Sequence, residues 1–268
     1  MQCMLGVVFA FLLLVPMPAQ AAAKTKLTWF GHAAFAITLP SGKTVLVDPW
    51  LTNPANPQGK AQVETQAADL ILVTHGHFDH VGDAAAIAKR TGAKLVSTFD
   101  LGNSLAAYAG YPPKQMGFDT MGNFGGEVTL LDGEVTIRFV PAIHGSTMQP
   151  ENDKDVHPAG SPGGFVIMIK NGPTIYHTGD TEVFGDMALI GRRHKIDYML
   201  ACIGGHFTMD PQGAAEAAKL VGATTLVPMH YGTFPVLTGT PADLEKAIKK
   251  EGAKTKVLSL KIGVPTVL

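Results

Sequence analysis

Cysteine is nearly absent from this sequence of 268 residues, which contains two, Cys3 and Cys202. Cys3 lies in an N-terminal segment that we expect to be removed, so the remaining chain would hold one thiol and could form no disulfide within itself. Cys202 lies in the apolar run 198–203, and we interpret it as the thiol of a buried strand. The fold therefore depends on its core, for which an apolar content of 46% is ample.

The net charge is also close to zero, and arginine is rare. The net charge is −1, and 16% of the residues are charged. This balance offers no electrostatic basis for binding nucleic acid, which needs a clustered positive surface. Arginine, the residue best suited to forked recognition of phosphate, occurs only at Arg90, Arg138, Arg192 and Arg193. The composition favours a small-molecule substrate, and no feature of the sequence indicates an oligomeric state.

Long hydrophobic runs are also missing, because a membrane span needs roughly 20 apolar residues and the longest candidate, Leu5–Val15, is much shorter. Two prolines and the small-x-small pattern Ala19-Gln20-Ala21 follow it, in the order of a secretory signal peptide. We therefore predict a signal peptide over residues 1–23, a periplasmic or secreted protein, and no membrane span after cleavage. No Lys or Arg precedes the run, so an uncleaved anchor or a misassigned start stays open.

The remaining residues 24–268 are compatible with a single domain. Alternating and apolar runs predict strands within 26–39 (two strands) and at 44–47, 70–73, 94–98, 128–131, 135–140, 165–170, 174–177, 198–203, 225–228 and 257–261. Helices are predicted at 83–89, 101–109 and 187–192, and after Asp210-Pro211 and Thr240-Pro241. Hairpins dominate both ends of this order and helices lie between strands, which favours two sheets packed face to face with helices outside.

Three long segments lack strong structure signals: 52–65, 110–126 and 145–163. Loops of this length in a compact domain are usually functional or disordered. We interpret them as the walls of one pocket. Their apolar side chains, together with Phe234, would then line it; those side chains are Tyr111, Met116, Phe118, Met121, Phe124 and Met148.

The strongest chemical signal is the sequence His75-Gly76-His77-Phe78-Asp79-His80, directly after a predicted buried strand. Three imidazoles and a carboxylate fall within six residues, and such donors suit zinc and related divalent metals. A tight turn allows His75 and His77 to face one metal while Asp79 and His80 face a neighbouring one. The segment therefore predicts a metal centre.

This segment resembles the signature of the metallo-β-lactamase superfamily. The resemblance implies an α/β fold with four αββα layers, two mixed sheets and outer helices. It also implies two divalent metal ions, with zinc expected and manganese or iron as alternatives. The implied ligands of the first metal are His75, His77, His144 and Asp180. Those of the second are Asp79, His80, His230 and the shared Asp180.

Three further motifs resemble a narrower branch, the metal-dependent hydrolases similar to ascorbate-6-phosphate lactonase. They are Trp29–Phe35, Val47–Pro49 and Ile203–Met209. A glutamate at position 77 would have indicated the diiron oxidoreductases of the superfamily, and a cysteine at position 180 one class of β-lactamases; the chain has neither.

The expected reaction is attack by a hydroxide bridging two metals on a small ester, lactone or amide. Asp79 would orient the hydroxide, and His32 and His206 are candidates for substrate contact or proton delivery. Asp48 is expected to hold a ligand imidazole in its tautomer. Of the other histidines, we interpret His177 as a hydrogen-bonded strand residue, and His157 and His194 as solvated.

Two alternatives stay open. The same ligands could serve an iron-dependent oxidoreductase or thiol-ester enzyme, because ligand type alone does not separate zinc, manganese and iron. A non-catalytic periplasmic binding protein that kept the fold is the alternative outside enzymes. Loss of a ligand would mark it, and no ligand position is missing.

Overall fold

The computed structural model of the protein describes residues 24–150 and 153–268. The predicted signal peptide lies outside the described residues. Among the helices of the described ranges, none is long and apolar enough to cross a membrane.

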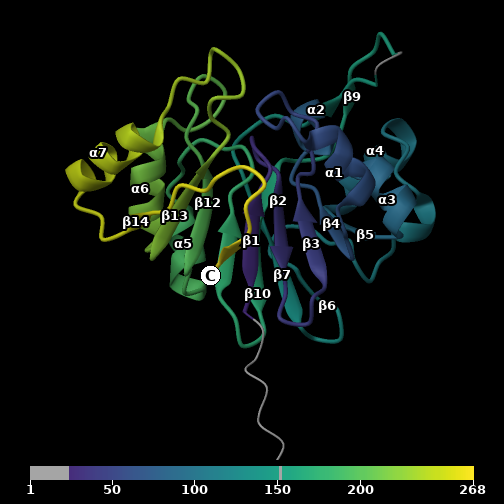
Figure 1. Ribbon diagram of the computed structural model, residues 1–268, viewed down its shortest axis with the longest axis horizontal. Helices are drawn as coiled ribbons and strands as arrows, with labels where there is room; N and C mark the ends of the chain where they lie inside the picture. Colours follow the sequence, from purple (N-terminus) through teal and green to yellow (C-terminus); the bar gives the residue numbers. More distant parts are fainter. Residues whose placement is uncertain (1–23, 151–152) are drawn as a thin grey trace, which may run out of the picture.

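Two mixed sheets form the centre of the described chain (Figure 1). The first sheet has the strand order β15 (Thr266–Val267), β1 (Lys26–Trp29), β2 (Phe35–Thr38), β3 (Thr44–Val47), β4 (Leu70–Leu72) and β5 (Lys94–Val96). Strands β15 to β3 pair antiparallel, whereas β3, β4 and β5 run parallel. The antiparallel half thus forms the hairpins, and the parallel half carries the helical crossovers.

The second sheet has the order β14 (Lys256–Val257), β13 (Thr225–Met229), β12 (Tyr198–Cys202), β11 (Thr174–His177), β10 (Gly163–Ile169), β7 (Val135–Pro141) and β6 (Glu127–Leu130). Strands β11 to β14 are parallel, and β10, β7 and β6 are antiparallel to their neighbours. A small separate pair joins β8 (Thr147–Met148) to β9 (His157–Pro158).

Alternation along the strands shows that the first sheet is covered on both faces. In β3, Val45 and Val47 belong to the larger apolar cluster, which fills the space between the sheets, whereas Leu46 belongs to a second cluster. In β4, Leu72 and Ile71 divide in the same way. Because successive side chains point to opposite faces, a strand buried at every position needs cover on both sides.

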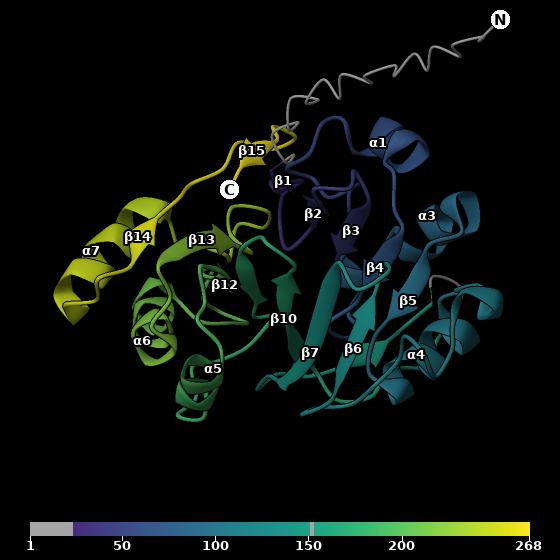
Figure 2. The same cartoon turned by 90° about the horizontal axis from the view of Figure 1, so that it is seen from below.

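Helices supply that cover. On the first sheet lie α1 (Gly59–Thr65), α3 (Ala84–Thr91) and α4 (Phe99–Tyr108), and on the second α5 (Met187–Arg193), α6 (Pro211–Val221) and α7 (Pro241–Glu251). Figures 1 and 2 show these two groups on opposite sides of the paired sheets. The four-layer α/β fold predicted from the resemblance is confirmed. Two short helices, α2 (Phe78–Val81) and the 3₁₀ turn η1 (Pro113–Gln115), lie in connections.

The last two long helices begin as their sequences predict. The Asp210 side chain accepts a hydrogen bond from Gly213 N, and the Thr240 side chain accepts one from Asp243 N. Each helix has a proline in its first turn and ends at a glycine in the left-handed conformation. The side-chain caps satisfy amide groups that the helix itself leaves unpaired.

The prediction of one closing strand over 257–261 is wrong. Strand β14 stops at Val257, and the chain then returns to the first sheet, where β15 pairs with β1. The crossing turns at Gly263, whose φ is 74° and whose amide donates to Trp29 O. The C-terminus therefore joins the two sheets, and a two-residue strand of this kind carries no periodic signal in the sequence.

Candidate metal centre

The predicted ligands lie at one edge of the two sheets, where strands β4, β7, β11 and β13 end. Strand β7 runs in the same direction as β11, because both are antiparallel to β10. Their carboxyl ends therefore lie at the same edge as those of the parallel strands. The segment His75–His80 follows β4, and single ligands follow the other three strands: His144, Asp180 and His230, in that order.

His75, His77 and His144 turn their ring nitrogens toward one point. His77 Nδ1 lies 3.0 Å from His75 Nε2 and 3.3 Å from His144 Nε2. Two nitrogens bound tetrahedrally to one zinc ion at normal bond lengths lie about 3.4 Å apart. The three imidazoles are thus spaced as ligands of a single ion.

Asp180 lies between this trio and the remaining ligands. Its Oδ2 atom is 4.0 Å from His75 Nε2 and 3.6 Å from His144 Nε2 on one side. On the other side, it is 3.3 Å from His80 Nε2 and 2.9 Å from His230 Nε2. A single carboxylate oxygen therefore faces nitrogens of both predicted ligand sets, which is the position that a bridging ligand requires.

Several of these atoms are buried without a hydrogen-bond partner in the described chain. They are His80 Nε2, Asp180 Oδ1 and both ring nitrogens of His230. Buried polar atoms are nearly always paired, because desolvation without a partner is costly. An imidazole binds a cation through one nitrogen, so cations here would satisfy His80 Nε2, His230 Nε2 and Asp180 Oδ1, and the residues present fit a metal centre.

Asp48 holds two of the candidate ligands in place from beneath. It is fully buried, and its carboxylate accepts hydrogen bonds from His80 Nδ1 at 2.7 Å and from Thr74 N and Oγ1 at 2.8 and 2.6 Å. Thr74 Oγ1 is in turn 3.0 Å from His75 Nδ1. These bonds leave Nε2 of both imidazoles free for a cation, so the predicted role of Asp48 agrees with its contacts.

His32 is fully buried, and its ring reaches Asp79 instead of solvent. Its Nε2 is 3.0 Å from Asp79 Oδ2, and its Nδ1 is 3.0 Å from Thr233 Oγ1. Asp79 Oδ2 is also 3.8 Å from His230 Nε2. This placement favours orientation of Asp79 over direct contact with a substrate. The His32 nitrogen also lies close enough to Asp79, His80 and His230 to share a cation with them.

His206 lies at the same edge but apart from the ligands. Its side chain is exposed, and its ring packs edge-on against Phe207, with 4.4 Å between centroids. Phe207, and not His206, lines the hollow above the ligands. A catalytic role for His206 stays a prediction.

The other three histidines differ in their surroundings. His177 is buried between Ala33 O, 3.1 Å from its Nε2, and Gly179 N, which donates to Nδ1 at 3.1 Å, as expected for a satisfied strand residue. The prediction of solvated rings is wrong for His157, which pairs with Asp153 at 2.8 Å and stacks on Tyr108. It is also wrong for His194, whose Nε2 is buried. Local packing, invisible in the sequence, explains both.

Strained backbone gathers at this edge. Non-glycine residues with left-handed φ include His32 (51°), Asp48 (45°), His206 (60°) and His230 (55°). Such conformations cost of order 1–3 kcal/mol each and persist where surrounding contacts enforce them. The other described examples lie in hairpin turns, at Leu131, Asp132 and Asn171. The concentration around the ligands supports a functional site.

Burial and charge divide the imidazoles into two groups. Burial lowers the pKa of His75 well below its usual range and also lowers the pKa of His77 and of His144. Burial would lower the pKa of His80 and His230 too, but the Asp180 carboxylate outweighs it. The pKa of His80 is raised well above its usual range, and that of His230 is raised to about 9. Only the first trio is thus neutral and ready for a cation at pH 7.

The carboxylates respond in the opposite direction. Burial would raise the pKa of Asp180, but His230 and His80 hold it well below its usual range. Burial would likewise raise the pKa of Asp79, but the neighbouring His230 imidazole and the hydrogen-bonded His32 imidazole lower it. Both carboxylates therefore stay ionised at neutral pH and available to a metal.

Metal binding at pH 7 should release about two protons per chain, since His80 and His230 must lose theirs to bind a cation. Because the pKa of His230 is raised to about 9, its share of the release should shrink as the pH approaches and passes that value. Calorimetric titration of metal-free protein with zinc, in buffers of different ionisation enthalpy, measures the number released. An apparent enthalpy independent of the buffer at pH 7 would contradict this assignment of charge.

A hollow of about 250 Å³ opens above the ligands. The hollow is lined by His77, His144, Asp79, Asp180 and His230, with Phe78 and Phe207 at its sides. Among the residues that the structure describes, no lysine or arginine lines it. No residue of segments 52–65, 110–126 or 145–163 lines this hollow, so the prediction that they form its walls is wrong here; Thr52 and Met148 instead line a neighbouring groove. Tyr111 and Met116 pack under the first sheet, Phe124 packs on the main core, and Phe118 points into solvent. Apolar loop side chains mostly attach the loops to the core.

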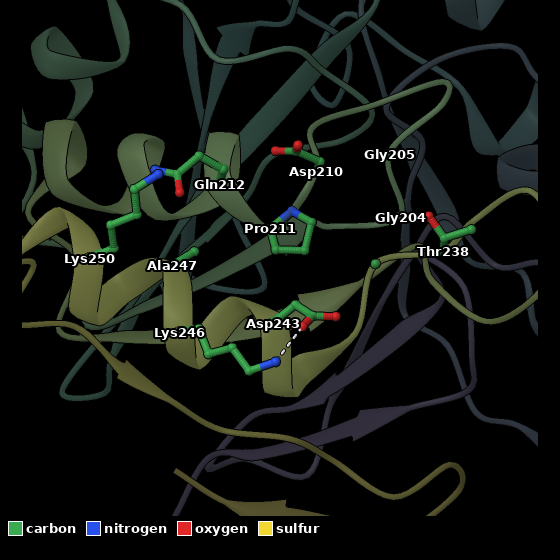
Figure 3. Close-up of a pocket in the computed structure, with 11 residues that line it drawn as sticks. Gly204, Gly205, Asp210, Pro211, Gln212, Thr238, Asp243, Lys246, Ala247 and Lys250 are labelled. Carbon is green, nitrogen blue, oxygen red and sulfur yellow. Dashed lines mark hydrogen bonds and ion pairs between the residues drawn. The ribbon is translucent and has the colours of Figure 1, made fainter.

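A different hollow lies between α6 and α7, away from the ligands (Figure 3). Three of its charged groups are already engaged, because Asp210 caps α6 and Asp243 pairs with Lys246 at 2.9 Å; Lys250 also lines it. None of the predicted site residues lines it, and we assign it no role.

Known proteins resemble both this fold and this sequence. The β-lactamase superfamily domain matches residues 43–231. The UPF0173 metal-dependent hydrolase of Thermodesulfovibrio yellowstonii is 54% identical over 254 residues, covering 94% of this chain and 95% of that protein. The corresponding protein of Archaeoglobus fulgidus is 43% identical over 239 residues, covering 89% and 96%.

A solved structure extends the comparison to three dimensions. Igni18, a metallo hydrolase from Ignicoccus hospitalis, superposes with a TM-score of 0.78 at 34% identity, over 92% of this chain and 99% of that one. The ligand motif, the four-layer fold and these relatives agree. The chain therefore belongs to the β-lactamase superfamily and, within it, to the UPF0173 group of metal-dependent hydrolases.

Proposed function

We propose that this hydrolase holds two divalent metal ions and cleaves a small ester, lactone or amide. The observation that carries the proposal is the position of Asp180 Oδ2, within 4.0 Å of nitrogens from both ligand sets. Bound ions would supply a water molecule of lowered pKa and polarise the bond to be cleaved. The set His75, His77, His144 and Asp180 would hold one ion. Asp79, His80 and His230 would hold the other together with Asp180.

The protein's own residues would orient this chemistry. Asp79 is partly exposed to the hollow, with its side chain 14% accessible, and His32 fixes it from behind. Asp48 and Thr74 fix the imidazoles of His80 and His75. Positioned ligands of this kind avoid reorganisation during the reaction, which is a main source of enzymatic rate enhancement.

The substrate class follows from what lines the hollow. With two phenylalanines at its sides and no described cationic side chain, it favours a compact, partly apolar substrate over a polyanion. The resemblance to the ascorbate-6-phosphate lactonase branch agrees with a lactone. Metals can themselves bind phosphate, so a phosphorylated lactone belongs in the substrate panel.

Metal-loaded enzyme should turn over carboxylic esters or lactones with kcat/KM at least about tenfold above that for bis-p-nitrophenyl phosphate or RNA. Chelated protein, before and after metal is restored, is the control that assigns the activity to the centre. Faster turnover of the phosphodiesters would show that this interpretation of the hollow is wrong.

We also propose that the protein is exported and cleaved near residues 21–23. N-terminal sequencing of protein from a periplasmic fraction would test this, and an intact Met1 in the cytosol would contradict it.

A further inference from the structure

A groove of about 600 Å³ adjoins the hollow above the metal ligands, and Phe78 lines both. We call it the aromatic groove, after the rings of Trp50, Phe78 and Tyr108 in its wall; Val81, Met148 and Pro150 add aliphatic surface. The volume is within the range of about 300–1,000 Å³ typical of small-molecule sites. Phe78 is thus a wall shared by the two hollows, and an arm of a molecule at the metal centre would have to pass this ring to reach the groove.

The groove carries no charge among its described lining residues. Its polar side chains, Thr52, Gln149 and Tyr108, are neutral, and both polar and apolar atoms reach its accessible surface. A charged substrate arm would lose its hydration there without gaining an ion pair, whereas an apolar arm would gain from burial. The lining therefore selects against phosphate, carboxylate and ammonium groups.

The position of Phe78 needs an explanation beyond folding. Its side chain is 64% exposed although it lies between two metal-ligand candidates in the sequence. The centroid of its ring lies 5.6 Å from that of Trp50 and 6.5 Å from that of Phe234. Trp50 and Phe234 stack on each other, with 5.9 Å between their centroids. An exposed ring contributes little to the core. Held by its aromatic neighbours, it forms a wall beside the reacting centre.

Close packing brings Trp50 onto the helix that carries the ligands. A Cβ atom at Gly82 would lie 2.5 Å from Trp50 Cδ1, so a side chain there would displace the indole. The glycine thus allows the indole to lie against the end of α2, where it lines the groove.

We infer that the aromatic groove binds a neutral arm of the substrate, packed against its aromatic and aliphatic side chains, on the acyl side of the bond that is cleaved at the metal centre. The inference rests on the proposed hydrolysis of esters or amides. It narrows the substrate class to acyl compounds with a chain or ring longer than acetyl.

The kinetic test uses p-nitrophenyl acetate, butyrate, hexanoate and octanoate with metal-loaded enzyme. Each CH₂ group that becomes fully buried is worth up to about fourfold in binding. We expect kcat/KM for octanoate to exceed that for acetate by at least about tenfold. Phe78→Ala and Tyr108→Ala should each reduce this ratio at least about threefold, because each removes a ring from the groove wall.

Phe118→Ala is the matched control. Phe118 is likewise exposed, at 88%, and stacked on one aromatic neighbour, Phe99, but it lines neither hollow. In the Phe118→Ala variant, the ratio of kcat/KM for octanoate to kcat/KM for acetate should equal that of the unmodified enzyme. A ratio that does not change with chain length in the unmodified enzyme, or an equal fall in all three variants, would overturn the inference.

A binding measurement separates this inference from the proposed function. The ketone 10-bromodecan-2-one cannot be hydrolysed, and its bromine quenches tryptophan fluorescence on contact. The chain has two tryptophans, and Trp29 is buried while Trp50 lines the groove. Saturable quenching, weakened in Tyr108→Ala but not in Phe118→Ala, supports the groove even if no ester is hydrolysed. Absence of saturable quenching contradicts it even if esters are cleaved.

Discussion

Replacement of Asp180 by alanine should lower the metal content from the proposed two ions per chain to fewer than one and reduce kcat/KM on the order of 10³-fold. Its Oδ2 atom faces nitrogens of both ligand sets, so the substitution removes a ligand from each. It also removes the carboxylate that raises the pKa of His80 and His230, so the pKa of both rings should fall in the variant. Metal analysis after native purification, together with steady-state kinetics, measures both effects.

Asp69→Asn is the control for this substitution. The Asp69 carboxylate accepts from Thr44 N at 2.7 Å, immediately before β4, and so lies at the end of the strand away from the ligands. The metal content of the Asp69→Asn variant should equal that of the unmodified protein. Circular dichroism of Asp180→Ala must show the native fold for the comparison to hold. A correctly folded Asp180→Ala protein that retains two ions would refute the bridging position.

Asp48→Asn should lower metal affinity by about 10–100-fold, the usual effect of removing a partner that orients a ligand. All three partners of the Asp48 carboxylate act as donors: Thr74 N, Thr74 Oγ1 and His80 Nδ1. An amide in its place would point its own NH₂ group at one of these donors, whichever way it is turned. The fold would be strained and the imidazoles of His75 and His80 loosened together.

Thr74→Val separates the two ligands in the same experiment. It removes the link from Asp48 to His75 but leaves the bond from Asp48 to His80, so its effect on affinity should be smaller. Competition with a chromogenic zinc chelator measures the affinities. Equal affinity in Asp48→Asn and the unmodified protein would show that this carboxylate does not position the ligands.

The positions of the candidate ligands could be anticipated, because the segment His75–His80 carries a local signal and the resemblance to the metallo-β-lactamase superfamily adds His144, Asp180 and His230. Each follows an apolar strand, and parallel strands bring their carboxyl ends to one edge. In the structure, ring nitrogens of His75, His144 and His230 surround Asp180 Oδ2, although these residues lie far apart in the sequence. The two-sheet architecture followed from hairpins and crossovers in the same way.

The pocket walls could not be predicted, because an apolar side chain in a loop gives no sign of which way it points. Tyr111 attaches its loop to the core, whereas Phe78, hidden between two ligands in the motif, faces the solvent beside them. The contact from His32 to Asp79 spans 47 residues and depends on the turn between β1 and β2. Only the apolar residues around His32 hinted at its burial.

The identity of the metal decides between hydrolysis and the iron-dependent alternative on the same ligands. Imidazole and carboxylate donors bind zinc, manganese and iron, so elemental analysis of natively purified protein is required. The relatives are named as hydrolases, which favours hydrolysis over a non-catalytic binding protein.

Titration of the metal-free protein with zinc, followed by ester hydrolysis, tests the central claim most directly. If Asp180 joins two sites, activity should rise to a plateau at two ions per chain, and mass spectrometry under native conditions should show both ions in the active species. A plateau at one ion, or full hydrolysis by the chelated protein, would contradict a two-metal hydrolase.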